Sequence, residues 1–187
     1  TRLRVGTRPN GIAGVELRAM LRAESIDPGL VPQRPIKGKL GIHDIAARHL
    51  DVASGFTISA GWYARELGLS LTSLSPQTYG VDFYGSALFT NQRWVSEKPE
   101  LVQKFAAASM KGWEYAIKHP TELADRISRD LKRKIPIRNI RGFNRFQSGQ
   151  VPRLTHHPVV QLGHTNPARW ARMHDALKDA GSVTGTF

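Results

Sequence analysis

Residues 79–120, YGVDFYGSALFTNQRWVSEKPELVQKFAAASMKGWEYAIKHP, decide the fold of this chain. The stretch is predicted to begin as a strand and to continue, after a polar turn, as a long amphipathic helix. Apolar residues such as Leu101, Phe105 and Trp113 recur at helical spacing, and Pro99 stands in the first turn, where a missing backbone N–H costs nothing. A strand that crosses between two parts of a molecule and is followed by a long helix predicts an α/β protein with two lobes.

The residues before this stretch alternate between strand and helix patterns, which predicts βαβ units and a mostly parallel sheet flanked by helices. The expected strands cover residues 3–6, 30–33, 51–57 and 69–74, and the expected helices cover 15–23, 42–49 and 60–67. After residue 97 the pattern is helical, with helices beginning at Pro99, Pro120 and Asn166-Pro167. Residues 132–140 are expected to form a surface connection or a short helix, and 143–158 to be irregular. We therefore expect an α/β ligand-binding lobe in 1–78, and the crossover strand with the helical remainder of the other lobe in 79–187.

Composition limits the class of protein. A chain of 187 residues can bury a sizeable core as one domain or two small lobes. No run of about 18 apolar residues is present, so no transmembrane helix is predicted. The absence of cysteine excludes disulfides, thiolate metal sites and a cysteine nucleophile.

The chain is strongly basic, with 27 basic and 15 acidic residues and a formal net charge of +12. Residues 129–145 form the densest basic run. We interpret the excess as a solvated basic face, with electrostatic contact to a membrane or a partner as the alternative. Nucleic acid is not an expected partner, because no recognition module is visible in the sequence.

Catalysis and metal binding have little support. His156 and His157 are adjacent and point to opposite faces of an extended chain, and His43 and His49 are not spaced to share one helix face. No nucleophile elbow or phosphate-binding loop is present. We expect no metal, no cofactor and no enzymatic activity.

The first candidate ligand contacts lie in the loops that follow the predicted strands. Asn10 could cap the helix that follows it, and Gly11 allows close backbone approach. Phe56 and Thr57 end the expected strand 51–57, and ligands on parallel sheets bind beyond the carboxyl ends of strands. A plain strand-to-helix turn explains the glycine loop equally well.

The second group lies on the expected crossover strand. Tyr79, Asp82 and Tyr84 offer aromatic faces and one carboxylate, which suit a planar organic ligand. Alternation along the strand places Phe83 on the opposite face. Phe83 is interpreted as a core residue, as is Phe56 although it remains a candidate contact. Trp113 and Trp170 are also predicted to be buried.

The chain resembles the SsuA/THI5-like group of solute-binding proteins. The resemblance rests on a Tyr-Gly-x-Asp strand, a Pro-Glu-x-Val helix start and a Lys-Gly-Trp-x-Tyr-Ala helix end; here they are Tyr79, Gly80, Asp82, Pro99, Glu100, Val102, Lys111, Gly112, Trp113, Tyr115 and Ala116. Residues 50–56 match a ligand-presenting strand, and residues 163–170 look like a tail found in members built into membrane sensors. Ser59-Ala60-Gly61 stands where the family often has Asn-Glu-Pro, which removes a charged ligand contact.

The resemblance implies a type II periplasmic-binding-protein-like fold, a periplasmic or extracytoplasmic location, and a segment before Thr1 that completes the first lobe. It implies binding of a small organic ligand, such as a thiamine-pyrimidine precursor or a sulfonate, in the service of an ABC permease or a fused sensor. One alternative is a thiamine-pyrimidine biosynthetic enzyme of the THI5 type, whose chemistry depends on a cysteine-rich motif that this chain lacks. Another is a basic interaction module without a small ligand.

Overall fold

A computed structural model of the chain describes residues 3–36, 41–130 and 137–186. The chain forms two compact units: unit 1 consists of Thr1–Tyr84 and Asn166–Phe187, and unit 2 of Gly85–Thr165. This grouping differs from the expected boundary after residue 78, because the last helix packs in unit 1. Among the described residues, no helix is long and apolar enough to span a membrane.

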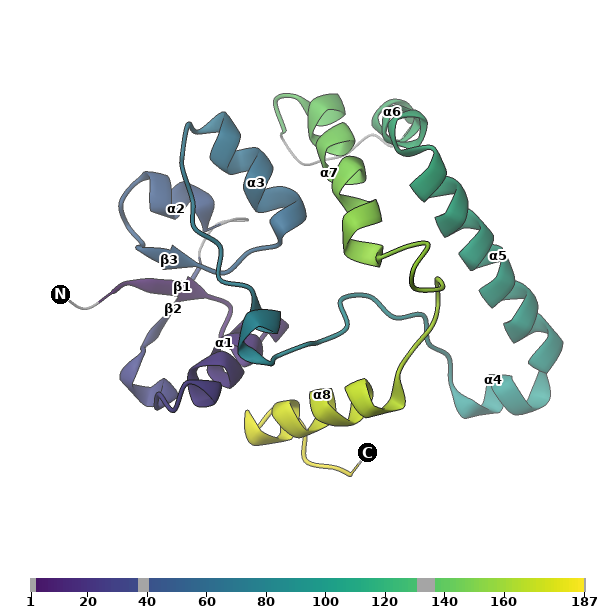
Figure 1. Cartoon of the computed structure of the whole chain (residues 1–187), viewed down its shortest axis with the longest axis horizontal. Helices are drawn as coiled ribbons and strands as arrows, with labels where there is room; N and C mark the ends of the chain where they lie inside the picture. The colour runs from purple at the N-terminus through teal and green to yellow at the C-terminus, as the bar shows by residue number, and fades with distance from the viewer. Residues whose placement is uncertain (1–2, 37–40, 131–136, 187) are drawn as a thin grey trace. The chain divides into compact units, whose positions relative to one another are not determined.

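A small parallel sheet forms the centre of unit 1. Its strands are β1 (Val5–Thr7), β2 (Gln33–Pro35) and β3 (Val52–Ala53), in the order β2-β1-β3. Val5 is aligned with Gln33 on one side and with Val52 on the other, and both pairings are parallel. Figure 1 shows β1 between its two neighbours. The predicted α/β class with a parallel sheet is confirmed.

Helices separate these strands, as the alternating pattern predicted. Gly68 lies just after α3 (Thr57–Glu66) with a φ of +64°, a conformation that suits glycine and ends the helix. Three helices match predicted segments with shifted ends, because local patterns define helix ends poorly. The helical elements of unit 1 are α1 (Ile12–Ala23), η1 (Pro28–Leu30), α2 (Ile42–Ala46), α3 (Thr57–Glu66), η2 (Pro76–Tyr79) and α8 (Pro167–Asp179).

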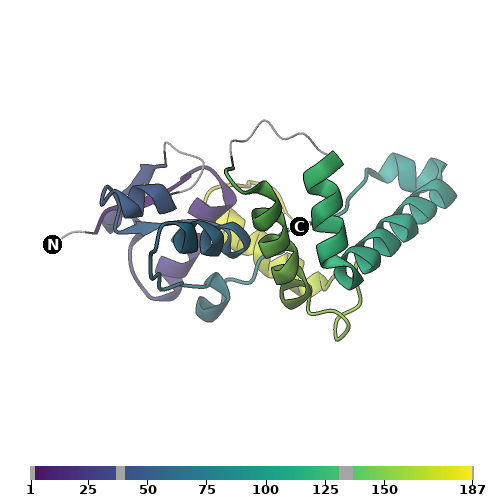
Figure 2. The ribbon, with the colours of Figure 1, turned by 90° about the horizontal axis from the view of Figure 1, so that it is seen from above.

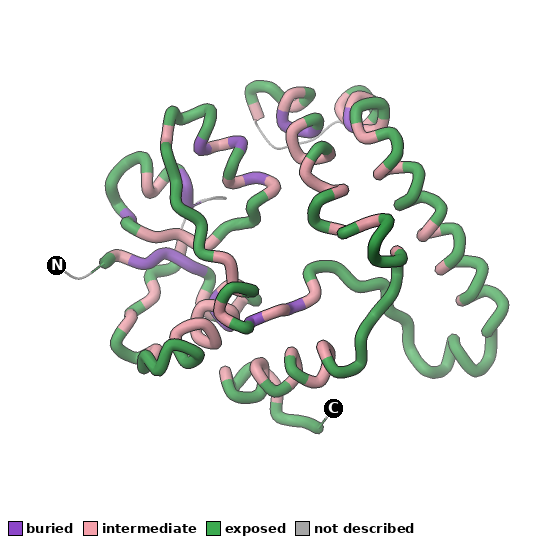
Figure 3. Tube along the Cα trace, viewed as in Figure 1, coloured by how far each residue is buried: buried purple, intermediate pink, exposed green. Residues whose placement is uncertain are grey.

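The apolar core of unit 1 joins α1 to the segment after η2 and to α8. Val15, Val81 and Phe83 are buried together, and Met173 and Leu177 of α8 pack against them. Figure 3 shows buried residues along β1 and in the segment that follows η2. Phe83 is therefore a core residue, as predicted.

Two predicted strands are wrong. Residues 81–84 form no strand ladder after η2, and residues 69–74 also contain no strand. The predicted alternation along the first segment is correct, because Val81 and Phe83 are buried while Asp82 and Tyr84 are partly exposed. Burial against α1 and α8 satisfies the apolar side chains without backbone pairing, and periodicity cannot distinguish these two arrangements.

Unit 2 is helical. Its helices are α4 (Gln92–Glu97), α5 (Pro99–Lys118), α6 (Pro120–Asp130) and α7 (Ile140–Thr155). The helices predicted to begin at Pro99 and Pro120 are confirmed. Part of the predicted connection at 132–140 lies outside the described residues.

The helices α6 and α7 pack side by side (Figures 1 and 2). Ala124 and Phe143 are buried, and Asn144 Nδ2 donates to Ser128 Oγ at 2.9 Å. At the start of α7, Asn139 Oδ1 accepts from Gly142 N at 2.9 Å and caps the helix. The expectation of irregular structure over 143–158 is therefore wrong, because tertiary burial and a cap stabilise a helix whose sequence has a weak period.

The helix α5 has the predicted length, but its apolar stripe is not a core. No residue of α5 is buried, and Trp113 is 45% exposed. The prediction that Trp113 is buried is wrong. Amphipathic spacing predicts a helix, but it does not identify the element that would cover its apolar face.

Candidate functional site

The carboxyl ends of the three parallel strands lie at one edge of the unit 1 sheet. At this edge Thr7 is fully buried, and Ser54 Oγ donates to Thr7 Oγ1 at 3.2 Å. Ser54 N donates to Gly6 O at 2.9 Å, and Ile36 N to Thr7 O at 3.1 Å. These contacts fix the loops that follow all three strands at the edge where open parallel sheets bind ligands.

The loop after β1 leads into α1. Gly11 is the N-cap residue with extended backbone, and no side chain caps the helix. Asn10 is exposed and lies one residue too early, so its predicted role as the cap is wrong. A Cβ atom on Gly14 would lie 2.4 Å from Pro9 O, because the first turn of α1 packs directly on the loop. Arg18 Nη1 also donates to Pro9 O, at 2.9 Å.

The loop after β3 leads into α3 in the same manner. Phe56 is the N-cap residue with extended backbone, and again no side chain caps the helix. Phe56 is 69% exposed, so the interpretation of Phe56 as a core residue is wrong. Thr57, the first helical residue, is also exposed.

Two helix N-termini without side-chain caps therefore follow the carboxyl ends of neighbouring strands. The first N–H groups of a helix have no partner inside the helix, and the helix dipole adds partial positive charge there. Such ends bind anions and other hydrogen-bond acceptors. Asn10, Gly11, Phe56 and Thr57, predicted as ligand contacts, lie in these two loop-to-helix turns.

The second predicted group lies elsewhere in unit 1, and two of its three residues, Asp82 and Tyr84, contact α8. Tyr79 is the last residue of η2 and is half-buried. Asp82 Oδ1 accepts from Arg169 Nη2 at 2.7 Å. The Tyr84 ring lies 4.8 Å from the half-buried Trp170 ring, and its hydroxyl accepts from Asn166 N at 2.7 Å. Asp82 and Tyr84 thus bind α8 in this structure.

Arg169 is the central residue of this group, and sequence reasoning missed it. Its guanidinium also donates to the backbone oxygens of Asp82 and Phe83, and it lies 4.0 Å from the centre of the Tyr84 ring. The sequence feature that could have indicated Arg169 is its position in residues 163–170, the segment that resembles the tail of sensor-linked family members. Asn166, by contrast, caps α8 through Oδ1 as predicted.

Another ion pair of unit 1 is at the opposite edge of the sheet. Arg4 precedes β1 and Asp51 precedes β3, and Arg4 Nη2 lies 2.8 Å from Asp51 Oδ1. Hydrogen bonds from Arg4 hold the pKa of Asp51 well below its usual range. This pair joins the amino ends of two strands, so we interpret it as structural.

One carboxyl group in α1 is perturbed by burial. Glu16 is half-buried, and the loss of solvent around it raises its pKa. Sequence reasoning did not single it out. In the described part of the chain, no group of three or more histidine, aspartate and glutamate residues could hold a metal ion.

The family model described as NMT1/THI5 like matches residues 3–123. The matched region covers the sheet and both candidate helix N-termini of unit 1, and it continues through α4 and α5. No curated protein matches the chain.

Proposed function

The chain belongs to the NMT1/THI5-like family, and from that premise we propose that it is an extracytoplasmic solute-binding domain. The family contains solute-binding proteins and THI5 biosynthetic enzymes, and the predicted resemblance to it is confirmed. In our proposal, a small organic ligand binds at the carboxyl edge of the unit 1 sheet. The bound state then serves an ABC transporter or a membrane sensor.

The observation that carries this proposal is the pair of helix N-termini without side-chain caps at Gly11 and Phe56. Their free N–H groups suit the oxygens of a sulfonate or the ring nitrogens of a pyrimidine, because both are hydrogen-bond acceptors. The exposed ring of Phe56 offers an apolar face for a planar ligand. The contact between buried Thr7 and half-buried Ser54 keeps the two loops in place.

Proline at the first helical position tests the role of these N–H groups. Ile12→Pro and Thr57→Pro each remove one free backbone N–H donor. The fold should tolerate both changes, because proline suits the first helical position and the N-cap residue before it already has the extended backbone that proline requires. Gln92→Pro is the matched control, because it makes the same change at the start of α4, after extended Asn91.

We expect one compound in a panel of alkanesulfonates and aminopyrimidines to bind the full chain in calorimetry. Ile12→Pro and Thr57→Pro should each weaken that binding by roughly 5- to 100-fold, as expected when a ligand acceptor loses its donor. Gln92→Pro should leave it unchanged. Unaltered affinity in both unit 1 variants would refute the placement of the site, and conversion of pyridoxal phosphate to a pyrimidine product would favour the biosynthetic alternative.

A further inference from the structure

The helices α6 and α7 form the basic hairpin, defined here as residues 120–130 and 137–155. The hairpin contains six arginines and three acidic residues, Glu122, Asp125 and Asp130, whereas residues 85–119 contain five basic and three acidic residues. The described residues of the hairpin therefore carry a net charge of +3, and all of their basic side chains are arginines. The arginines are Arg126, Arg129, Arg138, Arg141, Arg145 and Arg153.

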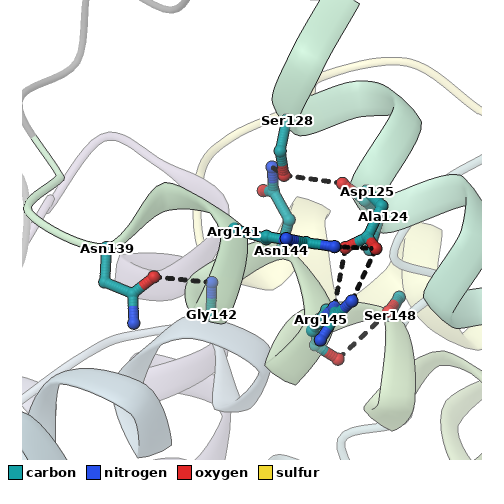
Figure 4. A network of polar contacts seen from close by, with 9 residues as sticks. All are labelled: Ala124, Asp125, Ser128, Asn139, Arg141, Gly142, Asn144, Arg145 and Ser148. Atoms are coloured by element: carbon teal, nitrogen blue, oxygen red, sulfur yellow. Dashed lines mark hydrogen bonds and ion pairs between the residues drawn. The ribbon is translucent and has the colours of Figure 1, made fainter.

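The two aspartates hold four of these arginines in place. Asp125 lies against both Arg141 and Arg145, whose Nη2 atoms are 2.6 Å and 2.5 Å from Asp125 Oδ2 (Figure 4). Asp130 pairs with Arg126 at 3.5 Å and with Arg129 at 2.9 Å.

Each carboxylate thus fixes two guanidiniums and neutralises one charge. A guanidinium has five N–H donors, so those of Arg141 and Arg145 keep donors for an anion. Within the described residues, Arg138 and Arg153 have no carboxylate partner. The hairpin therefore presents an ordered excess of positive charge.

Exposed apolar side chains adjoin the basic residues at the end of the hairpin. Leu154 is exposed next to Arg153, and Val159 is 91% exposed a few residues later. The aromatic residues between 120 and 165 are Phe143, which is buried, and Phe146, which is half-buried. Single-stranded nucleic acids need exposed aromatic rings for base stacking. Arginines beside exposed aliphatic side chains instead suit a lipid surface, where charge and shallow apolar insertion act together.

We propose that the basic hairpin of unit 2 docks on a membrane surface rich in anionic phospholipid. The arginines contact lipid phosphates, for which guanidinium geometry is well suited. Leu154 and Val159 enter the boundary between head groups and acyl chains. This surface lies in a different unit from the ligand site, so it does not depend on the identity of the ligand.

The test is co-sedimentation of the full chain with vesicles of two parts phosphatidylcholine and one part phosphatidylglycerol. Binding should weaken as salt rises and should be far lower on vesicles of phosphatidylcholine alone, because the attraction is screened. Arg138→Gln/Arg153→Gln should reduce the partition coefficient by roughly 25-fold, since each basic residue near an anionic surface contributes about fivefold. These two arginines are outside the paired network, so the hairpin should remain folded.

The matched control is Lys111→Gln/Lys118→Gln, which removes the same charge from α5 of the same unit. It should change vesicle binding by less than about threefold, because those charges are outside the docking surface. Val159→Asp should lower the binding that remains at high salt. Equal losses in the two double variants would overturn the proposal, as would binding to neutral vesicles that matches binding to anionic ones. Tight binding of duplex DNA at physiological salt, without binding to vesicles, would overturn the proposal and identify nucleic acid as the partner of the hairpin.

Discussion

Replacement of Arg169 by alanine should loosen α8 from the rest of unit 1. Arg169 Nη2 donates to Asp82 Oδ1 at 2.7 Å and to Phe83 O at 3.0 Å, and Nε donates to Asp82 O at 3.2 Å. The guanidinium also lies 4.0 Å from the centre of the Tyr84 ring. All these partners lie in residues 82–84, so one side chain joins α8 to the segment through which the chain leaves unit 1.

The expected loss is about 3 kcal/mol. The Arg169 side chain is 28% exposed and Asp82 is 42% exposed, so solvent screening limits the ion pair to about 1 kcal/mol. The two hydrogen bonds to backbone oxygens contribute about 1 kcal/mol together once competition with water is counted. The cation–π contact adds about 0.5 to 1 kcal/mol.

Amide hydrogen exchange of the full chain measures this loss locally. Protection of the α8 amides should fall by roughly 100-fold in Arg169→Ala, since each 1.4 kcal/mol corresponds to about tenfold in the opening equilibrium. Arg172→Ala removes an exposed arginine from the same helix and should change protection by less than about threefold. Equal protection in the two variants would refute the assignment of a structural role to Arg169.

The same measurement decides the role of Asp82. The sequence predicts Asp82 as a ligand contact, and that role remains a prediction. The contact with Arg169 predicts that Asp82→Ala also loosens α8 and that its effect is not additive with Arg169→Ala. Additive effects on exchange, combined with weaker ligand binding in Asp82→Ala, would support the ligand role instead.

Two further predictions concern the stability of unit 2 in acid and the space available to a side chain at Gly14 in unit 1. Arg141 and Arg145 hold the pKa of Asp125 below its usual range. This carboxylate therefore stabilises unit 2 fully above about pH 5, and the stabilisation is lost progressively as pH falls from its ordinary pKa near about 4 toward the lowered pKa. When the helical circular-dichroism signal is followed as the pH is lowered, Asp125→Asn should therefore lose helix less steeply than the parent chain. An equally steep loss in both proteins would contradict this. Gly14→Ala should destabilise unit 1 by about 1–3 kcal/mol in urea unfolding, because its Cβ would meet Pro9 O at 2.4 Å. Gly149→Ala is the control, since nothing lies within 4 Å of the added Cβ atom, and equal loss in both would exclude the steric cause.

The predictions that succeeded depend on neighbours in the sequence. Helical spacing with Pro99 and Asn166-Pro167 at helix starts predicted α5 and α8, because caps and periodicity act over one or two turns. The alternation of strands and helices predicted the parallel sheet, since a helical crossover returns a strand to the same direction.

Only the tertiary structure decided which faces and loops meet. Arg169 reaches residues 82–84 across more than eighty positions, and no local pattern indicates such a contact. Phe56 and Trp113 are exposed although their residue type favours burial, because burial depends on which distant element covers them. The segment 81–84 alternates like a strand without pairing, because side-chain packing against α1 and α8 produces the same pattern as a half-buried strand.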